Sequence, residues 1–114
     1  MRTIIFTLTS LVLLVSCAPT KTLYSWNNYE ITSYNYLKNS DEKAIQELIK
    51  TYKQIIGKQT GTRRVVPPGI YADYGFVLMQ ANRTNEAKTF LLKEVELYPE
   101  SKQFIEKILK MIEE

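Results

Sequence analysis

The chain has 114 residues, no histidine and one cysteine, with 15 basic and 12 acidic side chains. It therefore lacks the residues for a histidine-based catalytic triad, a Cys–His nucleophile pair, a Cys/His zinc site or an internal disulfide. A formal net charge of +3 gives no concentrated basic face for nucleic acid. We expect a protein that is not an enzyme, binds no metal or other cofactor and does not bind nucleic acid.

Residues 1–16 are expected to be a cleavable signal peptide. Met1 and Arg2 precede an uncharged, mostly apolar run from Ile4 to Val15. Its length suits a secretory leader of roughly 7–15 apolar residues and falls short of the roughly 20 that a spanning helix needs. A buried core helix is the alternative, and it fits poorly because the run is apolar on every side.

The run closes with Leu14-Val15-Ser16-Cys17, which resembles the bacterial lipobox. The resemblance implies that the Cys17 thiol receives a diacylglyceryl group and that the leader is cut just before it. The new amino terminus is then acylated, for example with palmitate, and a multiple-chain anchor of this kind holds a protein stably at a membrane. An ordinary signal peptide followed by an ordinary cysteine is the alternative.

Ala18 and Pro19 follow the cysteine, so the aspartate that retains lipoproteins in the inner membrane is absent. In a bacterium with two membranes this implies an outer-membrane location, and we expect the domain to face the periplasm. Residues 17–23 are expected to be a lipidated, mobile tether, and residues 24–114 a single domain.

The first predicted helix covers the aromatic segment from Tyr24 to Leu37. Its apolar residues approximate one helical stripe: Trp26, Tyr29, Ile31, Tyr34 and Leu37. Asn39 is predicted to cap the next helix, with Glu42 completing a capping box. The apolar residues from Ala44 to Ile56 then recur at helical spacing, and Gly57 ends that helix.

A loop over residues 58–69 contains two glycines and two prolines, and Pro68 is predicted to open the following helix, which runs to Ala81. Gly75 lies inside this helix, where it indicates close packing of a neighbour. A fourth helix is predicted from a Thr84 cap to Tyr98, and a fifth begins at about Glu100. No stretch alternates with period two, so we predict an all-α fold.

The stretch from Pro68 to Pro99 resembles a tetratricopeptide repeat. The matching positions are Tyr71, Tyr74, Gly75, Leu78, Ala87, Leu91 and Pro99. Asn82 replaces the usual turn glycine, which is tolerable because asparagine adopts the left-handed conformation, and Glu94 occupies a slot that is normally alanine. The resemblance implies two tetratricopeptide-like helical hairpins and a C-terminal capping helix, stacked in a short right-handed array.

The domain is also similar to a family of short bacterial lipoproteins catalogued as domain of unknown function forty-eight ten. The residues that carry the likeness are Tyr24-Ser25-Trp26, Tyr29, Arg64, Val66-Pro67-Pro68-Gly69-Ile70, Ala72-Asp73-Tyr74-Gly75, Leu97-Tyr98-Pro99-Glu100-Ser101 and Phe104-Ile105. The family accompanies a curli-secretion-channel-like lipoprotein and a second uncharacterised lipoprotein. The resemblance thus implies an outer-membrane assembly and leaves the activity open.

Candidate partner-binding residues fall into two groups. Trp26 and Tyr29, with Tyr34 and Tyr36, would form an aromatic platform, or else they cover the open end of the helical stack. The second group is Arg63, Arg64, Pro67, Pro68, Gly69 and Asp73. The two arginines suit a carboxylate, phosphate or carbonyl on a partner, or else they are solvated or paired with Asp73.

The remaining members of the second group also have structural interpretations. Pro67, Pro68 and Gly69 suit a role in loop geometry, and Asp73 suits a helix N-terminus. Glu94 and Glu96 do not form a glycosidase pair, because residues two apart on a helix point in different directions. We expect an outer-membrane lipoprotein that serves as a non-enzymatic interaction and assembly module for other envelope lipoproteins. The alternative is a small envelope protein that binds a peptide or polymer.

Overall fold

The computed structural model describes Met1 and residues 20–114, so Cys17 and almost all of the predicted leader lie outside the described residues. The described part of the chain is helical and contains no strand, which confirms the predicted all-α fold. Its elements are α2 (Tyr29–Asn39), α3 (Glu42–Gly57), α4 (Ile70–Gln80), α5 (Thr84–Leu97), the short 3-10 turn η2 (Pro99–Ser101) and α6 (Lys102–Glu113). Within residues 20–114, none of these helices is long and apolar enough to cross a membrane.

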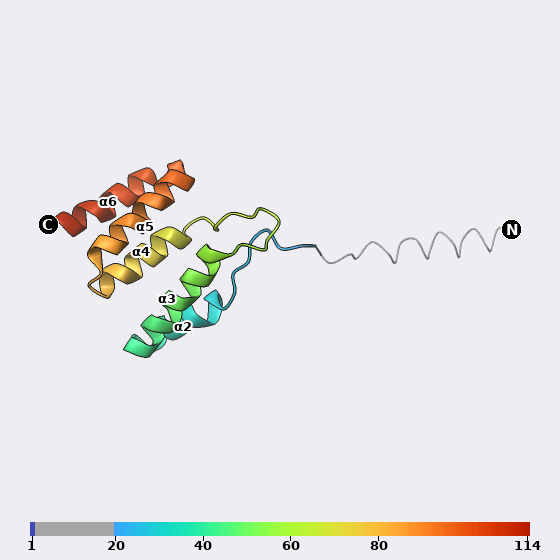
Figure 1. Cartoon of the computed structure of the whole chain (residues 1–114), viewed down its shortest axis with the longest axis horizontal. Helices are drawn as coiled ribbons and strands as arrows, with labels where there is room; N and C mark the ends of the chain where they lie inside the picture. Colours follow the sequence, from blue (N-terminus) through green and yellow to red (C-terminus); the bar gives the residue numbers. More distant parts are fainter. Residues whose placement is uncertain (2–19) are drawn as a thin grey trace.

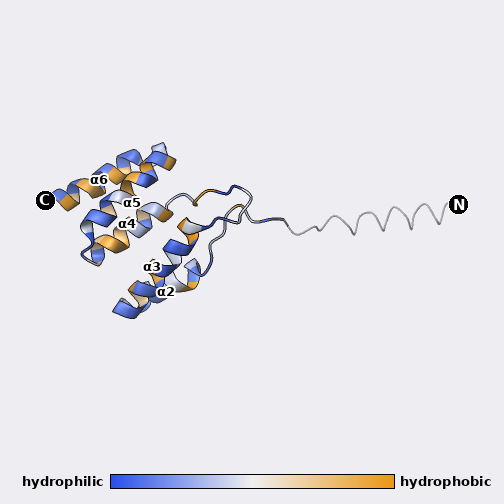
Figure 2. Ribbon diagram, viewed as in Figure 1, coloured by the Kyte–Doolittle hydropathy of each residue, from blue (hydrophilic) through white to orange (hydrophobic). Residues whose placement is uncertain are grey.

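The helices pack as two hairpins and a closing helix (Figure 1). α2 packs against α3, α4 packs against α5, and α6 lies on α5. Contacts between α3 and α4 join the two hairpins. In α3 and α6 the apolar and polar residues lie on opposite sides of the helix, and Figure 2 shows both kinds of residue along these two helices.

The core forms where the buried apolar residues of neighbouring helices meet. One buried cluster joins α3, α4 and the loop before α4, and a smaller one joins α4, α5 and α6. Across the two clusters, the large side chains that are most deeply buried are Leu48, Ile55, Ile70, Tyr74, Leu78, Leu91 and Ile105. The helical spacing over residues 44–56 predicted the inward side of α3 correctly.

The first helix begins later than its aromatic residues suggest. α2 starts at Tyr29 because Ser25 is held by the side chain of Gln59 and Asn27 has a positive φ of 49°. The predicted cap at Asn39 is also wrong, because α2 continues through that residue. Asp41 is the cap of α3, and its Oδ1 accepts a hydrogen bond from the Ala44 amide at 2.8 Å.

The predicted apolar stripe of the first helix does not face the core. Ile31, Tyr34 and Leu37 are 54–78% exposed. The inward side is made by Tyr29, Thr32 and Tyr36 instead. Thr32 can be buried because its hydroxyl donates to the Asn28 carbonyl at 2.9 Å, which satisfies the polar group within the helix.

The first residues of α4 and α5 also differ slightly from the prediction. α4 begins at Ile70 rather than at Pro68, after Gly69 with φ 90°. Thr84 is the first residue of α5 and makes no capping hydrogen bond.

Gly75 and Asn82 have the roles that the sequence predicted. A Cβ at Gly75 would lie 2.8 Å from Leu91 Cγ and 3.1 Å from the Ala87 carbonyl oxygen, so α4 and α5 approach closely there. Asn82 has φ 59°, the left-handed conformation that a turn glycine would otherwise supply.

Candidate functional site

A groove of about 260 Å³ lies between α2, α3 and α4. It is lined by Tyr29, Ser33, Tyr36, Leu37, Leu48, Tyr52, Asp73, Phe76 and Val77. A larger hollow of about 440 Å³ takes its walls only from α2 and the turn before it. The groove is the stronger candidate site because three helices converge on it and its walls combine aromatic, apolar and acidic side chains.

Tyr29 and Asp73 meet in this groove. The Tyr29 hydroxyl donates to Asp73 Oδ2 at 2.7 Å, which connects α2 to the first turn of α4. Burial, together with the hydrogen bond to Asp73 and the negative charge of that carboxylate, raises the pKa of Tyr29 to about 12. The pKa of Tyr52 is raised as well, first by burial and then by the charge of Asp73.

A row of aromatic rings extends from the rim of the groove into the core. Trp26 packs on Tyr29 at 5.7 Å, Tyr29 on Tyr52 at 5.9 Å and Tyr52 on Tyr74 at 5.2 Å between ring centroids. The Tyr74 ring then lies 4.4 Å from that of Phe90 on α5. Trp26 is 43% exposed at the outer end of the row, so the same aromatic residues form both a surface and part of the core.

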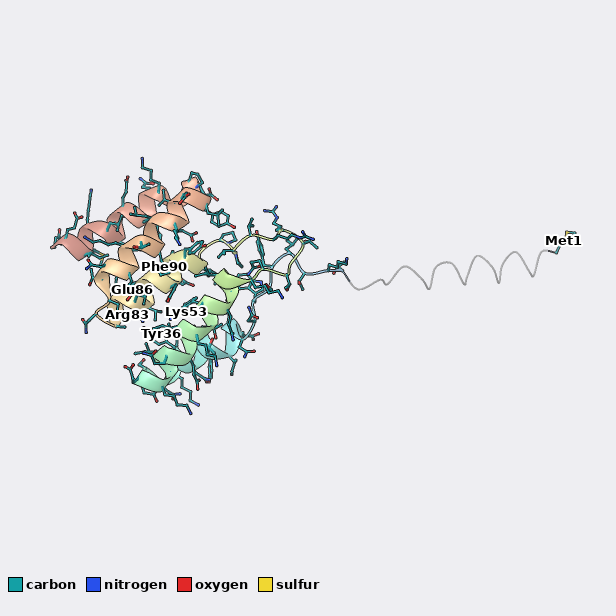
Figure 3. All side chains as sticks on the ribbon, viewed as in Figure 1. Met1, Tyr36, Lys53, Arg83, Glu86 and Phe90 are labelled. Carbon is teal, nitrogen blue, oxygen red and sulfur yellow. The ribbon has the colours of Figure 1, made fainter. Side chains whose placement is uncertain are left out.

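An exposed ion pair opens α5. Arg83 Nη2 lies 2.6 Å from Glu86 Oε2, and these hydrogen bonds hold the pKa of the Glu86 carboxyl below its ordinary value. The charge of Lys53 on α3 lowers the same pKa, and Figure 3 labels these three side chains. Because both side chains are substantially exposed, the pair contributes little to the stability of the fold.

Glu94 has a structural role that the sequence did not predict. It is only 2% exposed on α5, and its Oε1 accepts from the Gly69 amide at 2.8 Å. Its Oε2 accepts from the Ala72 amide at 3.4 Å, so the carboxylate caps the N-terminus of α4 from outside that helix. The available signal was the start of α4, which offers glycine where a serine, threonine, aspartate or asparagine cap is usual.

Arg63 and Arg64 lie apart from the groove. Both are exposed on the loop between α3 and α4, and Asp73 is bonded to Tyr29 rather than to either arginine. Arg64 adopts a positive φ of 53° in this loop. The structure therefore brings Tyr29 and Asp73 together, places Trp26 at their edge, and leaves the two arginines at another surface.

The prolines and Gly69 shape the loop end that leads into α4. Pro67 is fully buried, whereas Pro68 is exposed. The Tyr98 hydroxyl donates to the Val66 carbonyl at 2.6 Å, and burial is the main reason that the pKa of Tyr98 is raised to about 12. Over residues 20–114, no group of three or more carboxylate or thiol side chains is placed to hold a metal ion.

Residues 23–108 match the sequence model of the family described as Domain of unknown function (DUF4810). The chain belongs to this family. The match covers both the groove and the loop with the two arginines, so these features lie within the DUF4810 domain. No curated protein matches the chain, and no solved structure matches it.

The DUF4810 domain is expected to lose stability between pH 10 and pH 12. Tyrosines ionise near pH 10 when unfolded, whereas Tyr29 and Tyr98 have folded-state pKa values of about 12. Their stabilising contribution is complete below pH 10 and is lost as the pH rises through 12, because the unfolded chain then releases protons that the folded chain retains. Denaturant unfolding at a series of pH values measures this loss.

The variant Tyr29→Phe separates the contribution of the groove. It is expected to show a smaller loss over this pH range than the unmodified domain, since the contribution of Tyr29 is then absent while tyrosines such as Tyr98 retain their raised pKa values. Tyr34→Phe is the matched control, because Tyr34 is exposed on the opposite side of α2. An unchanged pH dependence in Tyr29→Phe would contradict the Tyr29–Asp73 contact.

Proposed function

We propose that this protein is a lipid-anchored, non-enzymatic interaction module of the bacterial outer membrane, facing the periplasm and binding other envelope proteins. The lipobox-like sequence ending at Cys17 supports the anchor. The family likeness to proteins that accompany a curli-secretion-channel-like lipoprotein suggests an assembly as the setting. The single observation that carries the binding function is the groove between α2, α3 and α4.

The chemistry of the groove suits a short peptide segment from a partner. Phe76 and Leu37 offer exposed apolar surface, and the rings of Tyr29 and Tyr36 extend it. Asp73 adds an acceptor for a peptide amide or a basic side chain. A volume of about 260 Å³ accommodates a few side chains, which suits a segment of a protein partner.

A second candidate is a small envelope protein that binds a polymer. It is favoured by Trp26, whose exposed ring is supported by Tyr24 at 6.2 Å and Tyr29 at 5.7 Å between centroids. Such a supported ring can stack on a sugar face. Loss of polymer binding in Trp26→Ala, with partner recovery unchanged, would favour this candidate over the first.

Affinity purification of the full-length protein from detergent-solubilised envelopes tests the proposal. The unmodified protein is expected to recover a defined set of envelope lipoproteins, and Phe76→Glu is expected to reduce that recovery at least about tenfold by placing a charge on an apolar contact. Phe104→Glu on α6 is the matched control, since Phe76 is 45% and Phe104 60% exposed. Circular dichroism checks that both variants are folded.

Three outcomes would contradict the proposal. Recovery of no partner would argue against an interaction module, and equal recovery by Phe76→Glu would exclude the groove. For the anchor, Cys17→Ser is expected to leave the membrane fraction. A Cys17→Ser protein that stays membrane-bound with normal leader processing would overturn the lipoprotein assignment.

A further inference from the structure

The start of the described chain is held against the loop between α3 and α4. The amides of Thr62 and Arg63 donate to the carbonyls of Thr22 and Leu23, both at 3.1 Å. Residues 22–25 and 58–63 are called the N-terminal clamp below. Two residues of the predicted tether, Thr22 and Leu23, thus belong to it, and Figure 1 shows the two segments side by side at one end of the domain.

Side chains strengthen the same contact. The Ser25 amide donates to Gln59 Oε1 at 3.0 Å, and Gln59 Nε2 donates back to the Ser25 carbonyl at 2.9 Å. Gln59 Nε2 also donates to the Ile55 carbonyl at 3.0 Å, which ties the contact to the end of α3. The clamp therefore fixes how the chain enters the domain.

Among charged side chains, the two chain segments that meet at this end carry only positive ones. Residues 18–29 contain Lys21 as their only charged side chain, and residues 57–72 contain only Lys58, Arg63 and Arg64. All four are exposed, and the rest of the chain has 11 basic and 12 acidic side chains. The small positive charge of the chain is thus concentrated where the domain begins.

Apolar side chains are exposed among these charges. Leu23 is 57%, Trp26 43% and Val65 38% exposed. Basic residues interspersed with tryptophan and aliphatic side chains are typical of surfaces that lie in the headgroup region of an anionic membrane. The composition suits a lipid surface better than a purely ionic contact with a protein.

The short distance to the lipid anchor indicates that a membrane, rather than a protein, contacts the clamp. Thr22 follows Cys17 by five residues, which span at most about 17 Å at roughly 3.4 Å per residue. An anchor at Cys17 therefore keeps the clamp within that distance of the membrane. At such proximity a weak surface contact becomes effectively intramolecular and is strongly favoured.

We infer that the N-terminal clamp, with Lys21, Lys58, Arg63 and Arg64, docks on the anionic phospholipid headgroups of the membrane that holds the anchor. The inference rests on the proposed lipid anchor at Cys17. Docking fixes the orientation of the domain, because Gln59 ties the clamp to the end of α3. The groove takes its lining from α2, α3 and α4 rather than from the clamp, so it stays available to a partner.

Fluorescence of Trp26 tests the inference, since it is the only tryptophan of the chain. The processed lipoprotein is reconstituted into vesicles with brominated acyl chains, made either of phosphatidylcholine alone or of phosphatidylcholine with phosphatidylglycerol. In the anionic vesicles we expect a blue shift and quenching of the Trp26 emission. About 1 M salt should reverse both, because it screens charges beyond about 3 Å.

The double variant Arg63→Gln/Arg64→Gln is expected to lose most of the quenching in anionic vesicles. Lys107→Gln/Lys110→Gln is the matched control, since it removes the same charge from exposed positions on α6 and should behave as the unmodified protein. Quenching of the arginine variant equal to that of the unmodified protein would overturn the inference. A Trp26 shift that requires added envelope proteins would identify a protein as the occupant and also overturn it.

Vesicle flotation and the mass of the Cys17 peptide show whether the protein is lipid-anchored, independently of the Trp26 fluorescence. An anchored protein whose Trp26 emission is the same in both kinds of vesicle would overturn the docking inference and leave the proposed function intact. A Cys17 peptide without acyl chains would overturn both.

Discussion

Replacing Glu94 with alanine is expected to lower the free energy of unfolding by about 2–4 kcal/mol. The carboxylate is 2% exposed and accepts hydrogen bonds from the amides of Gly69 and Ala72. Alanine would leave the N-terminus of α4 without this acceptor and would create a cavity beside it. Denaturant unfolding followed by circular dichroism measures the change.

This variant distinguishes the structural role of Glu94 from the repeat pattern. The tetratricopeptide template has alanine at this position, so the pattern alone predicts that Glu94→Ala is neutral or stabilising. The contact with α4 predicts the opposite sign. Glu96→Ala is the control because Glu96 is exposed two residues further along α5. Equal stability of the two variants would contradict the capping role.

Helices were predictable from this sequence wherever an apolar stripe is buried along its whole length. Ala44, Leu48, Ile49, Tyr52 and Ile55 recur at helical spacing, and all five are buried on α3. Burial of such a stripe requires the helix, so the pattern and the fold agree. The Gly75 prediction succeeded for a similar reason, because only a close neighbour explains a glycine inside an apolar helix.

The predictions for α2 failed where polar contacts decided the outcome. The aromatic stripe suggested that Ile31 and Tyr34 face inward, yet Thr32 lies there with its hydroxyl satisfied by the Asn28 carbonyl. The start of the helix depends on Gln59, which holds Ser25 from 34 residues away. Such contacts leave no periodic signal in the sequence.

The candidate site was predicted in part. Tyr29 and Asp73 were both candidates, but the sequence suggested Arg63 or Arg64 as the partner of Asp73. The hydrogen bond joins residues 44 positions apart, and their meeting depends on how α2 lies against α4. Residue types therefore identified the members of the groove, while only the packing of the helices determined which of them meet.

Replacing Gly61 with alanine is expected to open the N-terminal clamp and to lower the free energy of unfolding by about 2–3 kcal/mol. A Cβ at this buried position would collide with the backbone of Leu23 and Tyr24. Backbone atoms cannot shift as easily as the end of a flexible side chain, so the segment that contains Leu23 and Tyr24 must move away. The hydrogen bonds from Thr62 and Arg63 would then be lost.

Denaturant unfolding measures the stability loss, and limited trypsin digestion is expected to cut faster after Lys21 and Arg63 once the clamp is open. Gly57→Ala is the first control, because nothing lies within 4 Å of a Cβ there. Alanine at that helical position should be neutral or stabilising by up to about 1 kcal/mol.

Thr62→Ala is the second control, since it keeps the amide that donates to Thr22. If Gly61→Ala matched both controls in stability and in digestion, the clamp would not be closed in solution. The chain would then enter the domain freely, and a lipid at Cys17 could not hold the positive end of the domain in one orientation against the membrane.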